Sequence, residues 1–388
     1  MNNFENTKNK LIEFVEKKYF TGAVLKINRN KENIFSFSFG INDVDKKTKM
    51  NEDLIFRGYS LTKTVTVAAF LTLIDKKIIS LNEPLHKFFP EFKNMKVLNN
   101  NEIIDAKKEI LIKHLLTMTS GLAYFGNKNI TQKETTVLLS EFVKPVNGEF
   151  MNYKEFIKKL SKIPLEFEPG TNWRYGLSLD VIAGVIEKVT GMTYRDFVKE
   201  AIFDKLEMSD SDFYLKDKNR EAKVYNWSLV NDEPILKKVE NFNFFIQEID
   251  KVPKMPMGGA GLFTTVKDYL KFLDFLIDGK DSKGNQIISK KILKEMTSDK
   301  LKKLKSNFRW TLNEDYSYGY GVRVRIKNDN FPLTEIGEFG WDGLLGSIGL
   351  VDPLNKFSVC LMLSSKPGHN KLIESEFFAE LYKDLKSI

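Results

Sequence analysis

The chain has 388 residues, of which 42% are hydrophobic and 29% charged, a composition that excludes a disordered or fibrous protein and predicts a large folded core. Its 60 basic and 52 acidic residues give a formal charge of +8, but acids are interleaved with the basic residues and no basic stripe alternates with aromatic residues, so no nucleic-acid partner is expected. The single cysteine, Cys360, excludes an intrachain disulfide and a cysteine-based metal cluster.

The first elements predicted along the chain are one helix and two strands. Residues 4–18 space their apolar side chains as an amphipathic helix does, and this stretch lacks the apolar core of a secretory signal. The strand-like runs 22–27 and 33–39 follow, separated by the polar turn 28–31. Because no signal segment is seen, the sequence predicts a cytoplasmic protein.

The middle of the chain shows helical periodicity. Its longest strongly apolar stretch, 65–74, is far too short to span a bilayer, so no membrane association is expected. The polar segments 126–152 and 215–256 are expected to be irregular, and such excursions are suited to act as lids over a site. The stretches predicted to be helical are 64–77, 109–118, 153–162, 177–189, 193–203, 265–277 and 288–297.

The C-terminal part returns to strands and ends with an amphipathic helix at about 372–385. Strands at both termini with helices between them predict an α/β (α+β) fold: an antiparallel sheet built from both chain ends, flanked by helices and carrying an inserted all-helical lobe. We expect one domain over 1–388, with an α/β lobe of about 1–75 plus 290–388 and a helical lobe of about 76–289. The predicted C-terminal strands are 320–326, 333–339, 345–351 and 357–363.

The first candidate for chemistry is the Ser60-x-x-Lys63 spacing at the start of an apolar helix. Residues three apart lie on one helix face, so the Lys63 amine is expected to reach the Ser60 hydroxyl. A serine hydroxyl becomes a nucleophile when a base accepts its proton, and a buried lysine serves as that base if its surroundings disfavour the charged form. The alternative is a helix-capping serine beside an ordinary surface lysine, a spacing that arises by chance in a lysine-rich chain.

Two further motifs are candidates. Tyr175 immediately precedes a predicted helix that Gly191 ends, and a tyrosine held there can pass a proton to a leaving group; the alternative is a packing tyrosine. The glycine-rich stretch 340–347 leads into a predicted strand. Its glycines let the backbone approach a substrate, and an N–H at such a strand edge can supply half of an oxyanion hole; the alternative is a glycine-rich hairpin.

The order of these motifs resembles that of the class C β-lactamase-like serine hydrolases, a family that includes penicillin-binding proteins, D-amino-acid peptidases, transesterases and family VIII carboxylesterases. The motifs span nearly the whole chain: FRGYSLTKT (56–64), IKHLLTMTSGL (112–122), EPG (168–170) with Tyr175, IEKVTG (186–191), GAGLFTT (259–265), WDG (341–343) and VDP (351–353). The resemblance implies a β-lactamase/transpeptidase-like fold and a serine hydrolase that needs no cofactor.

The resemblance also implies roles for single residues. Ser60 is the acylated serine, Lys63 its partner, and Tyr175 the tyrosine of the family's Tyr-x-Asn element. The oxyanion hole would consist of the backbone N–H groups of Ser60 and Leu344. The substrate-binding residues implied are Leu177, Trp341, Asp342, Gly343 and Gly259.

Two departures from the family pattern bear on the substrate. Leu177 stands where β-lactamases have an Asn that binds the antibiotic's acylamino group, and Trp341 stands where they have a Lys that attracts its carboxylate. Losing a buried donor and a cation should cost roughly several kcal/mol of recognition for an anionic β-lactam, whereas tryptophan offers apolar surface. The family's esterases and transesterases show the same kind of replacement. Asp342 departs even from these and adds a negative charge beside the site.

Other catalytic classes find little support. A Ser-His-Asp hydrolase needs a histidine near its serine, and the chain has only three histidines and no Gly-x-Ser-x-Gly elbow. His86 lies in a proline-rich connection and His114 in a family-typical helix, which leaves His369, after the last strand, as the one candidate. The same scarcity of histidine argues against a metal site.

Three functions remain open at this point. The leading one is an esterase or acyltransferase that forms an acyl-enzyme on small, fairly apolar carboxylic esters. The second keeps the mechanism but acts on amides, as a D-amino-acid amidase or peptidase or a weak β-lactamase. The third is a non-catalytic binding protein that retains the fold. A small ester or amide is thus the expected partner, while the oligomeric state and the main base among Lys63 and Tyr175 stay open.

Overall fold

The two chain ends build one antiparallel sheet in the computed structural model, which describes residues 4–100, 102–304, 314–329 and 334–387. Its strand order is β10-β11-β12-β13-β14-β1-β2-β3, so the first and last thirds of the chain meet at the β14–β1 pair, where Leu25 lies opposite Leu361. The strands are β10 Tyr316–Tyr318, β11 Arg323–Arg325, β12 Phe339–Asp342, β13 Ile348–Asp352, β14 Phe357–Met362, β1 Gly22–Arg29, β2 Glu32–Asp43 and β3 Thr48–Lys49.

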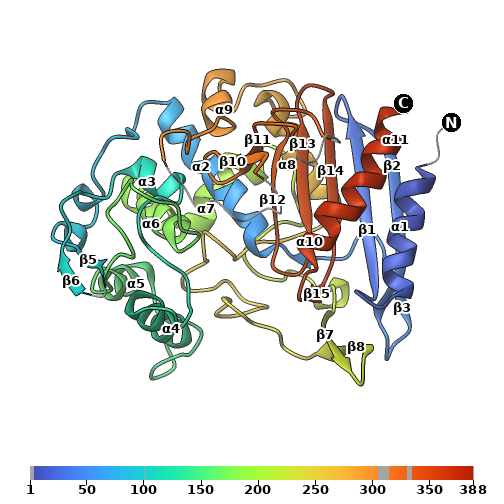
Figure 1. Cartoon of the computed structure of the whole chain (residues 1–388), viewed down its shortest axis with the longest axis horizontal. Coiled ribbons are helices and arrows are strands. Elements are labelled where there is room, and N and C mark those ends of the chain that lie inside the picture. Colours follow the sequence, from blue (N-terminus) through green and yellow to red (C-terminus); the bar gives the residue numbers. More distant parts are fainter. Residues whose placement is uncertain (1–3, 101, 305–313, 330–333, 388) are drawn as a thin grey trace.

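Alternate side chains of this sheet face two different layers. In β1, Leu25 and Ile27 belong to the apolar core formed with the terminal helices, whereas Val24 belongs to the larger core on the other face. Helices α1 (Glu5–Glu16) and α11 (Phe378–Lys386) cover the first face (Figure 1).

The terminal helices are held together by the buried Asp384. It accepts hydrogen bonds from the backbone N–H and the hydroxyl of Thr7 at 2.8 and 2.7 Å. The sequence prediction of a helix-flanked antiparallel sheet built from both chain ends is therefore confirmed.

Helix α8 (Val266–Asp278) packs on the other face of the sheet, against β13, β14 and β1. The hydroxyl of Thr265 accepts a hydrogen bond from the Asp268 N–H at its start, and Gly279, with φ of 77°, ends it. Its Asp274 accepts a hydrogen bond from Asn28 of β1 at 2.6 Å. Helix α8 lies within the range 76–289 expected for the helical lobe and packs on the sheet, and the boundaries of the two lobes stay a prediction.

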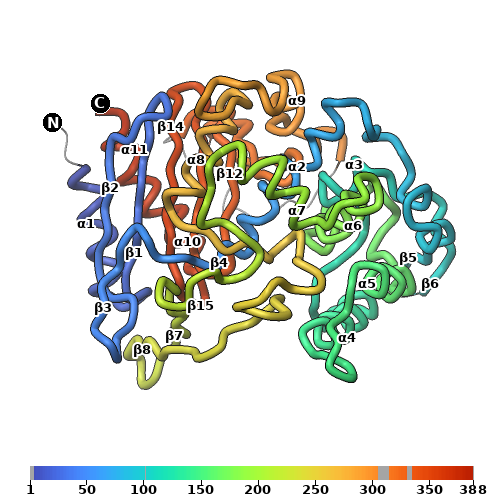
Figure 2. Tube along the Cα trace, turned by 180° about the vertical axis from the view of Figure 1, so that it is seen from behind, coloured from blue at the N-terminus to red at the C-terminus, as the bar shows by residue number. Residues whose placement is uncertain are grey.

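Most of the remaining helices lie to the side of the sheet, with α4 and α5 in the part of the molecule away from α1 and α11 (Figure 2). Apolar periodicity predicted most of them to within a few residues. They are α2 Thr62–Asp75, α3 Ile112–Leu116, α4 Ile130–Phe142, α5 Tyr153–Leu160, α6 Ser178–Thr190, α7 Tyr194–Val198 and α9 Lys290–Met296, with the single turn α10 Asn370–Leu372 before α11.

Several segments differ from their predictions. The segment 126–152 contains α4, which Asn129 caps by accepting from the Gln132 N–H, and 215–256 contains a hairpin turned by Asn231-Asp232. The fourth predicted strand, 333–339, begins only at Phe339 because Gly337, with φ of 94°, forms a turn; residue 333 lies outside the described residues. The smaller sheets are two strand pairs and one sheet of three strands. The pairs are β4 Phe56–Arg57 with β9 Phe263–Thr264 and β5 Lys96–Asn99 with β6 Glu102–Asp105, and the three-stranded sheet joins β15 Ser365–Lys366, β7 Val224–Val230 and β8 Glu233–Val239.

Candidate active site

Ser60 lies in a short 3-10 turn, Tyr59–Leu61, that leads directly into α2. Tyr59 adopts a left-handed conformation with φ of 44°, which is unusual for a bulky residue and marks a tightly held turn. Two contacts fix the turn from the side of β9: the Gly58 N–H donates to the Leu262 carbonyl at 2.7 Å, and the Leu262 N–H donates to the Thr62 hydroxyl at 3.0 Å. The Ser60 side chain stays half-buried between buried neighbours.

Lys63, one helical turn after Ser60, is fully buried and held by three oxygens. Its Nζ lies 3.2 Å from the Ser60 Oγ, 2.9 Å from the Tyr124 hydroxyl and 2.6 Å from the Gly259 carbonyl. Burial lowers the pKa of Lys63 to about 7, because an ammonium group loses its hydration there, although the charges of Asp180 and Asp342 oppose this shift. Near neutral pH the amine is therefore available in its uncharged form.

Tyr175 reaches Ser60 from the other side, out of the loop before α6. Its hydroxyl donates to the Ser60 Oγ at 2.7 Å and accepts from the Trp341 Nε1 at 3.1 Å. The Lys63 Nζ stands 4.6 Å from the centre of the Tyr175 ring. Burial raises the pKa of the Tyr175 phenol far above its ordinary value, so that the group stays protonated. The three side chains singled out in the sequence thus converge on one hydroxyl.

Two residues that the sequence analysis did not single out complete the surroundings of Lys63. Tyr124 contacts the amine through its hydroxyl, and burial raises its pKa well above the ordinary value. Asp180, in the first turn of α6, is fully buried, and burial raises its pKa to about 6 while the nearby Lys63 opposes this. The sequence contains a partial signal for both residues, because each lies close to an identified motif. Tyr124 stands two residues after Leu122, the end of the 112–122 motif, and Asp180 stands five residues after Tyr175.

Gly259 lies at the back of the site. Its carbonyl accepts from Lys63, and its N–H donates to Asp180 Oδ1 at 2.8 Å. A Cβ at this position would stand 3.0 Å from Asp180 Oδ2, 3.0 Å from the Tyr124 hydroxyl and 3.1 Å from the Lys63 Nζ. In the structure Gly259 contacts Lys63 and Asp180, and the substrate-binding role that the sequence analysis expected for it stays a prediction.

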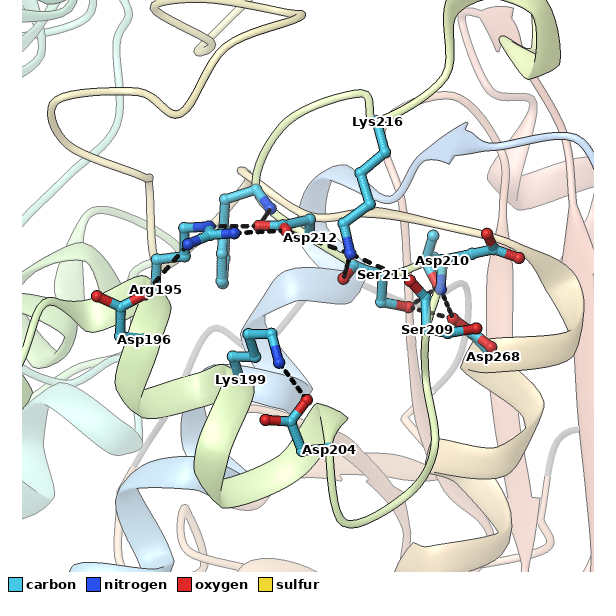
Figure 3. Close-up of polar contacts among 12 residues, drawn as sticks. Arg195, Asp196, Lys199, Asp204, Ser209, Asp210, Ser211, Asp212, Lys216 and Asp268 are labelled. Atoms are coloured by element: carbon cyan, nitrogen blue, oxygen red, sulfur yellow. Dashed lines mark hydrogen bonds and ion pairs between the residues drawn. The ribbon is translucent and has the colours of Figure 1, made fainter.

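Charged groups on the far side of β9 anchor the segment that carries Gly259. The Arg195 guanidinium donates to both carboxylate oxygens of Asp212 at 2.7 and 2.8 Å (Figure 3). The backbone of Asp212 in turn exchanges two hydrogen bonds with Phe263, four residues after Gly259. Asp268, at the start of α8, accepts from the Asp210 N–H at 2.8 Å on the same side (Figure 3).

The end of β12 brings the predicted oxyanion turn next to Ser60. The Gly343 N–H donates to the Ser347 carbonyl at 2.7 Å, which closes the turn containing Leu344. A Cβ on Gly343 would stand only 2.8 Å from the Gly58 carbonyl, so the turn and the Ser60 loop are in close contact. This geometry brings the neighbourhoods of both proposed backbone donors together, and their role in an oxyanion hole stays a prediction.

The residues predicted to contact substrate next to this turn are buried. The Trp341 side chain is 0% exposed, and Leu177, also 0% exposed, packs in the larger core. Asp342 is 3% exposed; it accepts from the Asn370 side chain at 2.6 Å and faces the Arg323 guanidinium at 3.8 Å. The charge that the sequence placed beside the site is thus partly compensated, and a substrate-binding role for these three residues stays a prediction.

The remaining histidine candidate packs elsewhere. The ring of His369 lies 5.2 Å from that of Tyr19 and 5.0 Å from that of Trp227, while Ser60 bonds to Lys63 and Tyr175. Within the described ranges, no group of three His, Cys, Asp or Glu residues is placed to hold a metal ion. No helix in the same part of the chain combines the length and the apolar character needed to cross a bilayer.

Comparison with known proteins assigns the family. The model of the Beta-lactamase family matches residues 7–380 of the chain. The chain belongs to the β-lactamase family. As a member with esterases among its relatives, this β-lactamase-family protein is a serine hydrolase.

Two relatives and one solved structure show what the chain is similar to. Protein Rv1367c of Mycobacterium tuberculosis is 24% identical over 374 residues, which is 90% of this chain and 87% of that protein. Esterase EstB of Burkholderia gladioli is 27% identical over 264 residues, 65% of this chain and 64% of the esterase. The solved structure of EstCE1, described as a hydrolase with promiscuous acyltransferase activity, covers 98% of both chains with a TM-score of 0.82 at 20% identity, and shares the fold.

Proposed function

We propose that this protein acts on small, fairly apolar carboxylic esters through an acyl-enzyme on Ser60, and passes the acyl group to water or to another alcohol. The observation that carries the proposal is the pair of hydrogen bonds that join the Ser60 Oγ to Lys63 and Tyr175 at 3.2 and 2.7 Å. The similarity to Esterase EstB and to EstCE1 supports the choice of esters.

The first half of the reaction removes the proton from Ser60. Since burial lowers the pKa of Lys63 to about 7 and raises that of Tyr175, the neutral amine accepts the proton and the phenol stays a donor. The Ser60 oxygen attacks the ester carbonyl, and the backbone N–H groups of Ser60 and Leu344 bind the resulting oxyanion. The Tyr175 hydroxyl gives its proton to the departing alkoxide and is reprotonated by the Lys63 ammonium.

The second half reverses these roles. Water or an alcohol takes the place of the leaving group, loses its proton to the same pair and attacks the acyl-enzyme, which restores the Ser60 hydroxyl. Trp341 supports both halves, because its indole N–H donates to the Tyr175 oxygen and orients the phenol. Because an indole takes the place of a cation at this position, the site suits apolar esters better than an anionic β-lactam.

Turnover of p-nitrophenyl acetate and butyrate tests the proposal. The native protein should hydrolyse both, with a burst of p-nitrophenol equal to the enzyme concentration if deacylation is slow, and Ser60→Ala should abolish the activity. Parallel assays with D-alanine p-nitroanilide and nitrocefin should give much lower rates than the esters. Unchanged turnover in Ser60→Ala, or faster cleavage of the amides, would contradict it.

A further inference from the structure

A row of aromatic rings crosses from the sheet side of the site to its helical side. We call residues 242–245 the aromatic strap. Phe242 packs edge-on to Tyr59, the neighbour of Ser60, at 6.0 Å between ring centres, and its carbonyl accepts from the Arg57 Nε at 3.1 Å. This end of the strap is therefore tied to the loop that carries the candidate nucleophile.

The other end of the strap reaches the tyrosine that holds Lys63. Phe245 stacks on Tyr124 at 5.7 Å with an angle of 18° between the rings, and Phe244 meets Phe125 edge-on at 5.6 Å. Phe125 is 47% exposed, and Phe244 is half-buried. The rings thus form an apolar surface that begins beside Ser60 and Lys63 and opens toward solvent.

One cation stands on this apolar surface. The Lys366 Nζ lies 5.3 Å from the centre of the Phe242 ring and 5.1 Å from that of Phe244. Its backbone is fixed near the candidate oxyanion turn, because the N–H of the preceding Ser365 donates to the Leu345 carbonyl at 3.2 Å. Across the described ranges, no carboxylate lies within ion-pair distance of Lys366.

We infer that the aromatic strap and Lys366 form a substrate subsite for an ester that also bears a carboxylate, with an apolar spacer between the carboxylate and the scissile bond. This inference rests on the proposed esterase function and names its substrate class. The rings bury the spacer. The ammonium lies over two ring faces, has no carboxylate partner in the described part of the chain, and pairs with the substrate's anion. Trp341 of β12 offers no positive charge to the substrate. In this proposal the positive charge comes from Lys366, in the segment after β14.

Matched anionic and neutral esters test this subsite. The acyl-side pair is mono-p-nitrophenyl adipate and p-nitrophenyl hexanoate; the alcohol-side pair is 4-acetoxybenzoate and its methyl ester. For each pair the measured quantity is the ratio of kcat/KM for the anionic ester to that for the neutral one. Lys366→Met should lower this ratio about tenfold for the pair whose carboxylate reaches the subsite, and leave the neutral ester unchanged within about twofold.

Two further variants give the experiment its controls. Lys294→Met removes an exposed lysine from α9, which lies at the top of Figure 1 whereas β15 lies toward the bottom, and should leave both ratios unchanged. Phe244→Ala should reduce kcat/KM for hexanoate and adipate esters alike, because it removes apolar surface from the spacer path. Raising the salt concentration should lower the native ratio in the same pair that Lys366→Met affects.

The outcomes separate this inference from the proposed function. Ratios that do not change in Lys366→Met for either pair, or that fall equally in Lys294→Met, would overturn the subsite, while hydrolysis of the neutral esters would still support the esterase. Unchanged activity in Ser60→Ala would instead overturn the proposed function. A fall in one ratio shows which side of the ester lies on the aromatic strap.

Discussion

At the scale of single residues, the protonation of Lys63 is central to the account. Among the described residues no carboxylate forms a salt bridge with the buried amine, and its hydrogen-bond partners are oxygens of Ser60, Tyr124 and Gly259. Asp180 influences Lys63 through its negative charge, which raises the pKa of the amine against the effect of burial. Its Oδ1 accepts a hydrogen bond from the Gly259 N–H. Asp180 is therefore a positioning residue that keeps the pKa of the base near neutrality.

Replacing Asp180 by Asn tests this role. Lys63 must be neutral to accept a proton, so activity rises with pH through its pKa of about 7. Removing the Asp180 charge removes an interaction that raises this pKa, and the acidic limb of the kcat/KM profile should move to lower pH by about one unit. The amide oxygen can still accept from the Gly259 N–H.

Asp274→Asn, a buried aspartate of α8 that bonds to Asn28, is the control and should leave the limb in place. A profile that stays fixed in Asp180→Asn would show that Lys63 does not sense this charge.

Tyr175→Phe tests the proton donor. The variant keeps the ring and its packing but loses the hydroxyl that contacts Ser60 and Trp341, so kcat should fall roughly 10² to 10⁴-fold with little change in KM. Tyr194→Phe removes another buried hydroxyl, which bonds to Thr66, and should retain activity. Equal activities of the two variants would contradict a catalytic role for Tyr175.

At the scale of elements, the segment before β9 decides where the lysine sits. A side chain at Gly259 would crowd Asp180, Tyr124 and Lys63. The Arg195–Asp212 pair fixes the strand that follows. The backbone of this segment thus acts as the rear wall of the site.

Gly259→Ala should displace the Lys63 amine and reduce kcat/KM about a hundredfold. The added methyl group would meet three polar atoms at 3.0 to 3.1 Å, a contact that requires the lysine or the strand to move. Gly284→Ala strains a left-handed turn with φ of 84°, but the added Cβ meets nothing within 4 Å, so the folded variant should keep its kcat/KM. Undiminished turnover in Gly259→Ala would show that this glycine is not needed to hold the lysine.

The same scale shows what the sequence predicts well and why. Helices such as α6 and α8 carry a repeating apolar face and end at glycines, Gly191 and Gly279, so periodicity finds them. The β7–β8 hairpin escapes this reasoning because alternate residues face solvent and its backbone pairs with β15, more than a hundred residues later. Long-range strand pairing leaves little trace in a local pattern.

For the site, local spacing predicts only one contact, that of Ser60 with Lys63. The approach of Tyr175 follows from resemblance to the family, not from any pattern of the residues around it. Asp180 and Tyr124 lie 117 and 61 residues after Lys63, and only the tertiary packing brings them to the lysine. The sequence predicts that Trp341 offers apolar surface. It does not predict the hydrogen bond from the indole N–H to Tyr175, because that bond depends on the rotamer that the core imposes.

At the scale of the whole molecule, the pH dependence of stability involves a partly buried histidine outside the site. The Nδ1 of His114 in α3 accepts a hydrogen bond from the Leu111 N–H at 3.1 Å, and this bond requires Nδ1 to be unprotonated. Burial lowers the pKa of His114 to about 4, and nearby lysines add to the effect. Between pH 6.5 and 4 the unfolded chain therefore binds a proton that the folded protein excludes, and folding weakens as the pH falls.

His114→Asn should reduce this pH dependence, since the amide oxygen can accept from the Leu111 N–H without titrating. Urea unfolding followed by tryptophan fluorescence at pH 7, 6, 5 and 4.5 measures it. The free energy of unfolding of the native protein should fall more steeply below pH 6.5 than that of the variant, by up to about 1.4 kcal/mol per pH unit. Parallel curves for the two proteins would mean that His114 does not contribute.

Covalent labelling with a fluorophosphonate tests the central claim most directly, because an activated serine displaces the fluoride of this reagent far faster than an ordinary hydroxyl does. The account predicts one added phosphonyl group on the native protein, with the mass shift on the peptide that contains Ser60, and strongly slowed labelling in Lys63→Met. An unlabelled native protein, or a label on any other residue, would contradict it.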